Sequence, residues 1–211
     1  MKQLYAITDP ALMPGELLIE KVEACLAGGC RYVQYRNKTG SDAERQRDAT
    51  ALTALCHQFD AFLIINDDIE LAQRTSAGGV HLGQDDEALA IARSKLGTAA
   101  IIGITCHDSL KLAIDAADQG ANYVAFGRFF PSTTKAMAPP ADLKLLRQAR
   151  QALKLPVVAI GGINIDNAAQ VVAAGADCLA VCHDIFAPAD LGIIEQRAKA
   201  YGQLFTECIT D

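Results

Sequence analysis

Residues 34–38 place an amide and two cations at alternate positions. Side chains of an extended segment alternate between its two faces, so Gln34, Arg36 and Lys38 share one face while Val33 and Tyr35 point the other way. Arginine offers a forked pair of donors and lysine a point charge, and both suit phosphate oxygens. Clustered cations repel one another unless an anion lies among them. This face therefore predicts a binding site for a polyanion such as pyrophosphate.

Two pairs of acidic residues follow apolar runs further along the chain. Asp67 and Asp68 come after the run FLIIN, and Asp85 and Asp86 come after the run GVHLG. Carboxylates with few histidines or cysteines beside them are the hard oxygen ligands that Mg²⁺ prefers, often shared with phosphate oxygens. Aspartate is also a common helix N-cap, and helical sequence follows both pairs. One member of each pair can cap a helix while the other faces a site, so the two interpretations are compatible.

The segment FPSTTKAMAPP also carries groups that suit an anion. Ser132 and Thr134 supply hydroxyls, and Lys135 supplies a cation, in a connection long enough to act as a lid. A plain surface loop has the same composition. A loop lysine such as Lys38 or Lys135 can equally extend into solvent, so these residues alone do not decide between the two interpretations.

Eight short apolar runs, many of them rich in β-branched residues, recur along the chain. They are LYAIT, YVQYR, FLIIN, GVHLG, IIGIT, YVAFG, PVVAIG and CLAVC. Segments with helical apolar spacing lie between them, and this alternation predicts βαβ units with a parallel sheet. A doubly wound open sheet is the competing architecture, but the first run ends in ITDP and not in a glycine-rich turn. We therefore expect an α/β fold, a single-domain (β/α)8 TIM barrel over residues 1–211, with the polar residues gathered at one mouth.

A second anion site is expected where such barrels commonly bind phosphate, in the loops after the last two strands. There the segment AIGGIN contains Gly161 and Gly162. Glycines let backbone N–H groups approach an anion closely, and a helix N-terminus follows. The histidines add less: His81 is as consistent with packing as with acid–base chemistry, and we assign no catalytic role to His57 or His183. No Ser-His-Asp or Cys-His arrangement predicts covalent catalysis.

The composition excludes several functional classes. The 211 residues are 51% hydrophobic and carry a net charge of −6, so no broad basic face is available for nucleic acid or a membrane surface. No apolar run approaches the roughly 18 residues that span a bilayer, and strand-like sequence begins at once without room for a signal peptide. The 7 cysteines lack a C-x-x-C pair and indicate buried thiols in a reducing compartment, not zinc ligands. We expect a cytoplasmic protein.

Five motifs carry a resemblance that covers the whole chain. The segments QYRNK, IINDD, VHLGQDD, FGRFFPSTTK and VVAIGGIN, in this order, resemble the thiamine-phosphate synthase family. The resemblance implies a (β/α)8 enzyme that joins 4-amino-2-methyl-5-hydroxymethylpyrimidine pyrophosphate to hydroxyethylmethylthiazole phosphate, releasing pyrophosphate and thiamine phosphate. It implies two small-molecule substrates and Mg²⁺ as the cofactor, and it leaves the oligomeric state open.

The resemblance also implies roles for individual residues. Those implied to bind the pyrimidine pyrophosphate are Gln34, Arg36, Lys38, Asn66 and Lys135. Asp67 and Asp86 would hold Mg²⁺, and Thr105 stands where the family usually has serine. Those implied to lie around the thiazole phosphate are Ser132, Thr134, Gly162, Cys182 and His183. Arg36, Lys135 and Thr105 are the expected catalytic residues.

The implied mechanism needs no strong base. An aminopyrimidine ring donates electrons to its methylene carbon, so departure of pyrophosphate leaves a stabilised carbocation that the thiazole nitrogen captures. The protein would then have to stabilise the charge that builds on the leaving group, which Mg²⁺ and a cluster of cations can do. A mouth rich in cations and amides and poor in nucleophiles is consistent with this chemistry.

Two departures from the family pattern concern the thiazole phosphate. His183 stands where the family usually has serine after the last strand, which removes a hydroxyl contact, and Arg128 replaces a common proline. Two other functions remain open. A thiazole tautomerase resembles this family in fold and sequence but would not need the full set of cations and acids, and a non-catalytic barrel would bind phosphate without turnover.

Overall fold

The computed structural model describes residues 3–84, 86–131 and 141–207. Eight parallel strands alternate with helices, and the strands form a closed barrel in sequence order. The strands are β1 (Gln3–Ile7), β2 (Tyr32–Tyr35), β3 (Phe62–Asn66), β4 (Gly79–Leu82), β5 (Ile101–Thr105), β6 (Tyr123–Phe126), β7 (Val157–Ile160) and β8 (Cys178–Val181). The helices are α1 (Leu17–Ala27), α2 (Asp42–Gln58), α3 (Ile69–Thr75), α4 (Asp86–Leu96), α5 (Leu110–Asp118), α6 (Lys144–Ala152), α7 (Ile165–Ala173), α8 (His183–Phe186) and α9 (Leu191–Glu207).

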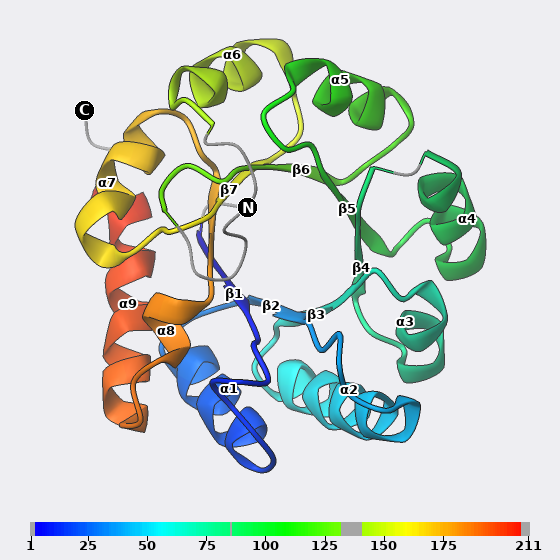
Figure 1. Ribbon diagram of the computed structural model, residues 1–211, viewed down its shortest axis with the longest axis vertical. Coiled ribbons are helices and arrows are strands. Elements are labelled where there is room, and N and C mark those ends of the chain that lie inside the picture. Colours follow the sequence, from blue (N-terminus) through cyan, green and yellow to red (C-terminus); the bar gives the residue numbers. More distant parts are fainter. Residues whose placement is uncertain (1–2, 85, 132–140, 208–211) are drawn as a thin grey trace.

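The ring of strands closes through β1 and β8. Each strand pairs in parallel with the next along the chain, and Tyr5 of β1 lies opposite Ala180 of β8. Figure 1 shows the strands as an inner ring with the helices around it. This confirms the (β/α)8 barrel expected from the eight apolar runs. A short α8 before α9 is the addition to the regular alternation.

The barrel contains two separate apolar regions. The larger lies between the strands and the surrounding helices, and it includes Val33 and Tyr35 of β2. The smaller fills the inside of the barrel, where Tyr5, Ile64 and Tyr123 pack together. Because side chains alternate along a strand, Gln34 between Val33 and Tyr35 faces the opposite way, as the sequence pattern predicts.

Polar caps begin several of the helices directly after the strands. Ser41, Asp68, Ser109 and Asn164 each accept a hydrogen bond from a backbone N–H in the first turn of the helix that follows. Such caps satisfy donors that the helix itself leaves unpaired. In a (β/α)8 barrel these helix N-termini lie at the same end as the mouth, so the loops that carry the caps also position the site.

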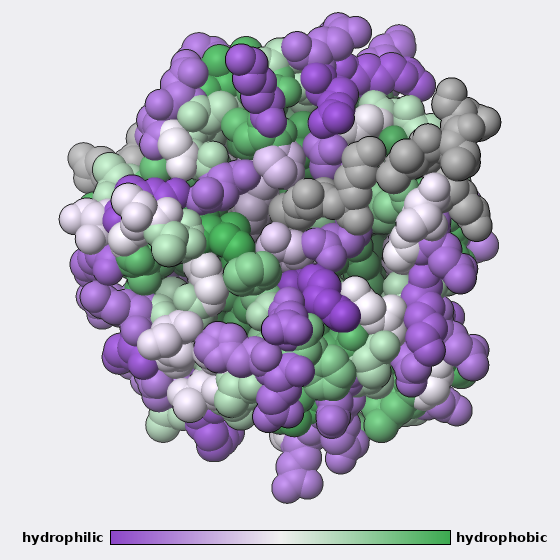
Figure 2. All heavy atoms as spheres, turned by 180° about the vertical axis from the view of Figure 1, so that it is seen from behind, coloured by the Kyte–Doolittle hydropathy of each residue, from purple (hydrophilic) through white to green (hydrophobic). Residues whose placement is uncertain are grey.

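The exterior mixes residue types. Figure 2 shows one face of the molecule, on which hydrophilic residues surround smaller hydrophobic groups. Among the described helices, none is long and apolar enough to cross a bilayer. Six cysteines lie in the described segments as free thiols; five are buried and Cys182 is partly buried.

Candidate active site

A cavity of about 550 Å³ opens at the carboxyl ends of the strands. Tyr5, Ile7, Val158 and Ala180 form apolar parts of its wall. It brings together nine of the residues predicted from the sequence: Gln34, Arg36, Lys38, Asn66, Asp67, Thr105, Gly162, Cys182 and His183. Their convergence at one mouth follows from the parallel barrel, which ends all of its strands on the same side.

The remaining predicted residues are not tested by the geometry. Ser132, Thr134 and Lys135 lie outside the described residues. Asp86 is the first residue of α4, in a part of that helix whose side chains the structure does not describe.

The cationic row leaves β2 and points into the cavity. Gln34 is 3% exposed, and its Nε2 donates to the hydroxyl of Tyr5 at 2.9 Å. The backbone N–H of Arg36 donates to Oγ1 of Thr8 at 2.9 Å, which ties the row to the end of β1. Lys38 lies further out, at the rim. The order from interior to rim is therefore amide, guanidinium and ammonium.

The acidic pair after β3 divides its tasks. Asp68 Oδ1 accepts from the backbone N–H of Leu71 at 2.8 Å and caps α3, while Asp68 Oδ2 pairs with Arg45 at 3.3 Å. Asp67 has a left-handed backbone with φ of 63°, a conformation unusual outside glycine. Its side chain faces the mouth, where Oδ2 accepts from Asn66 Nδ2 at 2.8 Å. One aspartate caps and the other faces the site, as the sequence allowed.

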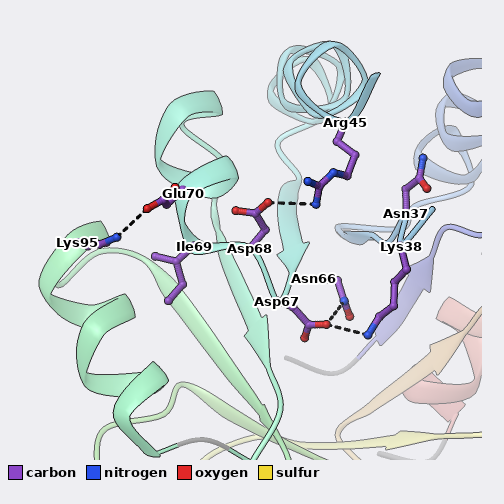
Figure 3. Close-up of a pocket in the computed structure, with 9 residues that line it drawn as sticks. All are labelled: Asn37, Lys38, Arg45, Asn66, Asp67, Asp68, Ile69, Glu70 and Lys95. Atoms are coloured by element: carbon purple, nitrogen blue, oxygen red, sulfur yellow. Dashed lines mark hydrogen bonds and ion pairs between the residues drawn. The ribbon is translucent and has the colours of Figure 1, made fainter. Parts of the chain in front are cut away.

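A second hollow lies on the outer side of this acidic pair (Figure 3). Lys38 Nζ approaches Asp67 Oδ2 to 2.9 Å, so these two residues form a wall that the hollow shares with the main cavity. On the far side, Lys95 pairs with Glu70 at 3.2 Å. The charges of this outer hollow are thus largely matched within the protein.

The described residues contain no group of three or more His, Cys, Asp or Glu side chains able to hold a metal ion. Mg²⁺ differs from zinc in this respect, because it keeps several waters and is usually bound by one or two carboxylates together with substrate phosphates. Asp67 offers one such carboxylate, half exposed at the mouth and already facing a cation, the Lys38 ammonium. The chemistry of this donor suits Mg²⁺ bound jointly with a phosphate-bearing ligand.

The opposite rim is a glycine turn between β7 and α7. Gly161 and Gly162 have φ of 105° and 65°, in the region that favours glycine. A Cβ on Gly162 would lie 2.3 Å from the backbone oxygen of Pro131, so only glycine fits. Asn167 Nδ2 holds the carbonyl of Gly162 at 2.9 Å, and Asn164 caps α7. This arrangement leaves a backbone surface beside a helix N-terminus, which suits an anion.

Cys182 and His183 complete the wall next to this turn. Burial, reinforced by the carboxylate of Asp9, raises the pKa of the Cys182 thiol to about 12. A thiol with such a pKa stays protonated near neutral pH and is a poor nucleophile. The departure from the family pattern therefore puts the imidazole of His183 where a serine hydroxyl is usual, beside the neutral thiol of Cys182.

A row of hydrogen-bonded side chains lies buried beneath the cavity, and the sequence patterns did not predict that these residues meet. The hydroxyls of Tyr5 and Tyr123 lie 2.8 Å apart, and Tyr123 lies 2.9 Å from Nδ1 of His81. Nε2 of His81 lies 2.8 Å from Oγ1 of Thr105. Both tyrosines occur in apolar runs and look like ordinary core residues there. The available signal was that each occupies an inward-facing strand position in a barrel whose interior is small.

The chain has close relatives of known family. A family model described as thiamine monophosphate synthase matches residues 4–185. A thiamine-phosphate synthase from Alcanivorax borkumensis is 52% identical over 202 residues, covering 96% of this chain and 93% of its own. Another from Marinobacter nauticus is 55% identical over 204 residues, covering 96% and 90%. The solved thiamine phosphate pyrophosphorylase from Pyrococcus furiosus matches with a TM-score of 0.85 at 32% identity, covering 98% of this chain and 96% of its own. These matches confirm the resemblance of the five motifs, and the chain belongs to the thiamine monophosphate synthase family.

Proposed function

We propose that this protein is a transferase of thiamine biosynthesis in the cytoplasm, a Mg²⁺-dependent thiamine-phosphate synthase. It would condense 4-amino-2-methyl-5-hydroxymethylpyrimidine pyrophosphate with hydroxyethylmethylthiazole phosphate. The observation that carries the proposal is one cavity whose wall carries two separate groups of residues suited to anions. The row of Arg36 and Lys38 lies on one side, and the Gly161–Gly162 turn lies on the other. Apolar residues of the same cavity wall would contact the two uncharged rings.

Each substrate then has a place. The pyrophosphate would lie against Arg36, Lys38 and Asn66, with its pyrimidine ring further in, over Gln34. The thiazole phosphate would lie on the backbone of Gly162, next to the N-terminus of α7 and to His183. Family resemblance adds Lys135 to the first site and Ser132 and Thr134 to the second.

The reaction would proceed by departure of pyrophosphate before the new bond forms. Arg36 and Lys135 would stabilise the charge that develops on the leaving oxygens, and Thr105 and Gln34 would orient the pyrimidine ring. Asp67 and Asp86 would hold Mg²⁺, which when bound supplies further neutralisation of that charge. The thiazole nitrogen attacks the ring's methylene carbon directly, so no general base is needed.

The direct test measures thiamine phosphate formed from the two purified substrates, with Mg²⁺ and with a chelator. We expect product with Mg²⁺ and none after chelation, with recovery when Mg²⁺ is restored in excess. Product that persists after complete chelation would contradict the metal assignment but leave the condensation in place. No product from folded protein would contradict the synthase assignment and favour a tautomerase or a phosphate-binding barrel.

Arg36→Ala tests the leaving-group site. Loss of one preorganised charged donor typically lowers turnover by about 10² to 10³-fold, and we expect a loss of that order. Arg74→Ala is the matched control, because Arg74 is an exposed arginine in the last turn of α3. Both variants should keep the melting temperature of the wild type to within a few degrees. Normal turnover in Arg36→Ala would overturn this assignment.

A further inference from the structure

A hydrogen-bonded chain crosses the barrel interior and joins two residues of the proposed site. It runs from Gln34 on β2 through Tyr5 on β1, Tyr123 on β6 and His81 on β4 to Thr105 on β5. Its four links measure 2.9, 2.8, 2.9 and 2.8 Å. The first four of these side chains are at most 8% exposed, so water does not compete with the links inside the barrel.

The donor at one end favours one direction for the four links. Gln34 Nε2 is an amide nitrogen and only donates, so the Tyr5 oxygen accepts there. Either hydroxyl of the Tyr5–Tyr123 pair could be the donor, and the direction that gives the buried Tyr5 proton an acceptor runs from Tyr5 to Tyr123. In this direction Tyr123 donates to Nδ1 of His81, which then carries no proton. The imidazole proton would then lie on Nε2, which would donate it to Oγ1 of Thr105.

We propose that Tyr123 and His81 are positioning residues that turn the Thr105 hydroxyl into a fixed hydrogen-bond donor aimed into the cavity. Thr105 Oγ1 accepts from His81, so the Thr105 hydroxyl proton remains for an acceptor that is not part of this row of hydrogen-bonded side chains. Thr105 lines the cavity, and a bound molecule can provide that acceptor. The identity of the molecule rests on the function proposed above.

Ring contacts around Tyr123 hold the hydrogen-bonded side chains in one arrangement. The Tyr123 ring meets Tyr5 edge-on at 5.8 Å between centroids and stacks on His81 at 5.6 Å. Gly103 lies opposite Tyr123 in the β5–β6 register, and a Cβ at Gly103 would come within 1.9 Å of that ring. A glycine at this position on β5 thus makes space for the aromatic ring. Burial raises the pKa of Tyr5 and of Tyr123, so both phenols keep the protons that the chain transmits.

The pyrimidine ring is the acceptor that this geometry suits. Gln34 and Arg36 lie two residues apart on one face of the β2 segment, so a pyrophosphate on Arg36 places its attached ring near Gln34. Gln34 and Thr105 are the two ends of the hydrogen-bonded row of side chains, and both face the cavity. A neutral pyrimidine has ring nitrogens that accept hydrogen bonds, and a donor held in place would select such a ring and fix its rotation.

The first experiment determines, without any substrate, which ring nitrogen of His81 carries the proton. In ¹⁵N-labelled wild-type protein, the ring nitrogens of His81 are observed by NMR and assigned from the spectrum of His81→Asn. We expect the proton on Nε2 and a bare Nδ1. A proton on Nδ1, whether or not Nε2 also carries one, would overturn the proposed direction.

The second experiment uses Tyr123→Phe, which removes the hydroxyl in the middle of the hydrogen-bonded row of side chains. A neutral hydrogen bond contributes up to about a factor of ten, so we expect the KM for the pyrimidine pyrophosphate to rise about threefold to tenfold. The donor acts on bound substrate before and during the reaction, so kcat and the KM for the thiazole phosphate should stay within twofold. The control is Tyr35→Phe, which removes a hydroxyl bonded to Asp48 on the outer side of β2.

The outcomes separate this proposal from the proposed function. Equal effects of the two phenylalanine variants, or a changed KM for the thiazole phosphate alone, would contradict the positioning role. Failure of the wild type to form thiamine phosphate would contradict the function, while the NMR result would still decide the direction of the chain. If Tyr123→Phe does not fold, the wild-type NMR measurement remains decisive.

Discussion

Asp67 and Asp68 are adjacent, chemically identical residues with different roles. One carboxylate oxygen of Asp68 caps α3 and the other pairs with Arg45, whereas Asp67 faces the mouth beside Lys38. The left-handed backbone at Asp67 turns the chain between them. The backbone conformation at Asp67 therefore determines which of the two carboxylates faces the cavity, where it could contact a ligand.

Cys182 offers a prediction at the same scale. Its thiol pKa of about 12 leaves far less thiolate at pH 8 than an ordinary cysteine has. We expect iodoacetamide to label Cys182 about a thousandfold more slowly in the folded protein than in urea, with a rate that rises about tenfold per pH unit. Peptide-resolved mass spectrometry measures the two rates. Rapid labelling of the folded protein at pH 8 would show that its environment favours the thiolate.

At the scale of elements, a buried lysine fixes the turn that carries His183. Lys21 of α1 is 4% exposed, and its Nζ donates to the carbonyls of Leu12 at 2.9 Å and Phe186 at 2.7 Å. The second carbonyl lies at the end of α8, the short helix that begins at His183. Burial lowers the pKa of Lys21. A helix of this length has little stability of its own, so a contact from α1 holds it in place.

Gly103 gives a prediction about strand packing. Gly103→Ala would put a methyl group into the Tyr123 ring, so we expect a loss of about 3 kcal/mol in the free energy of unfolding. Gly202→Ala is the matched control, because Gly202 lies in α9 with nothing within 4 Å of the added carbon. That change should stabilise the helix by up to about 1 kcal/mol. Urea unfolding measures both, and equal stability of the two variants would contradict the close packing at Gly103.

At the scale of the whole molecule, closure of the barrel brings the two proposed anion sites to one cavity. Arg36 follows β2 and Gly162 follows β7, yet both face one cavity because β1 and β8 pair. The pairing also joins the first and last parts of the chain. We therefore expect the 211 residues to unfold in one transition, as a single domain.

Pyrophosphate with Mg²⁺ should stabilise the folded protein and raise the midpoint temperature of that single unfolding transition. At a concentration of about 100 times Kd, binding adds about 2.7 kcal/mol, which for a chain of this size raises Tm by about 5 to 10 °C. Calorimetry with pyrophosphate alone, Mg²⁺ alone and both together measures the shift. Arg36→Ala should lose most of it. Two separate transitions, or a shift that the variant retains in full, would contradict this account of the molecule.

The sequence by itself determined the number and order of the strands, their bounds to within a residue or two, and the face of β2 that carries Gln34, Arg36 and Lys38. These are consequences of local patterns: apolar runs predict buried parallel strands, and alternation decides which side chains share a face. Family motifs then indicated the reaction. The tertiary structure alone showed which aspartate of the first pair caps a helix and that Tyr5, Tyr123 and His81 form one chain. The Tyr5–Tyr123 contact joins residues 118 positions apart. Which inward side chains meet across a barrel depends on the closure and register of all eight strands, and no local pattern specifies that.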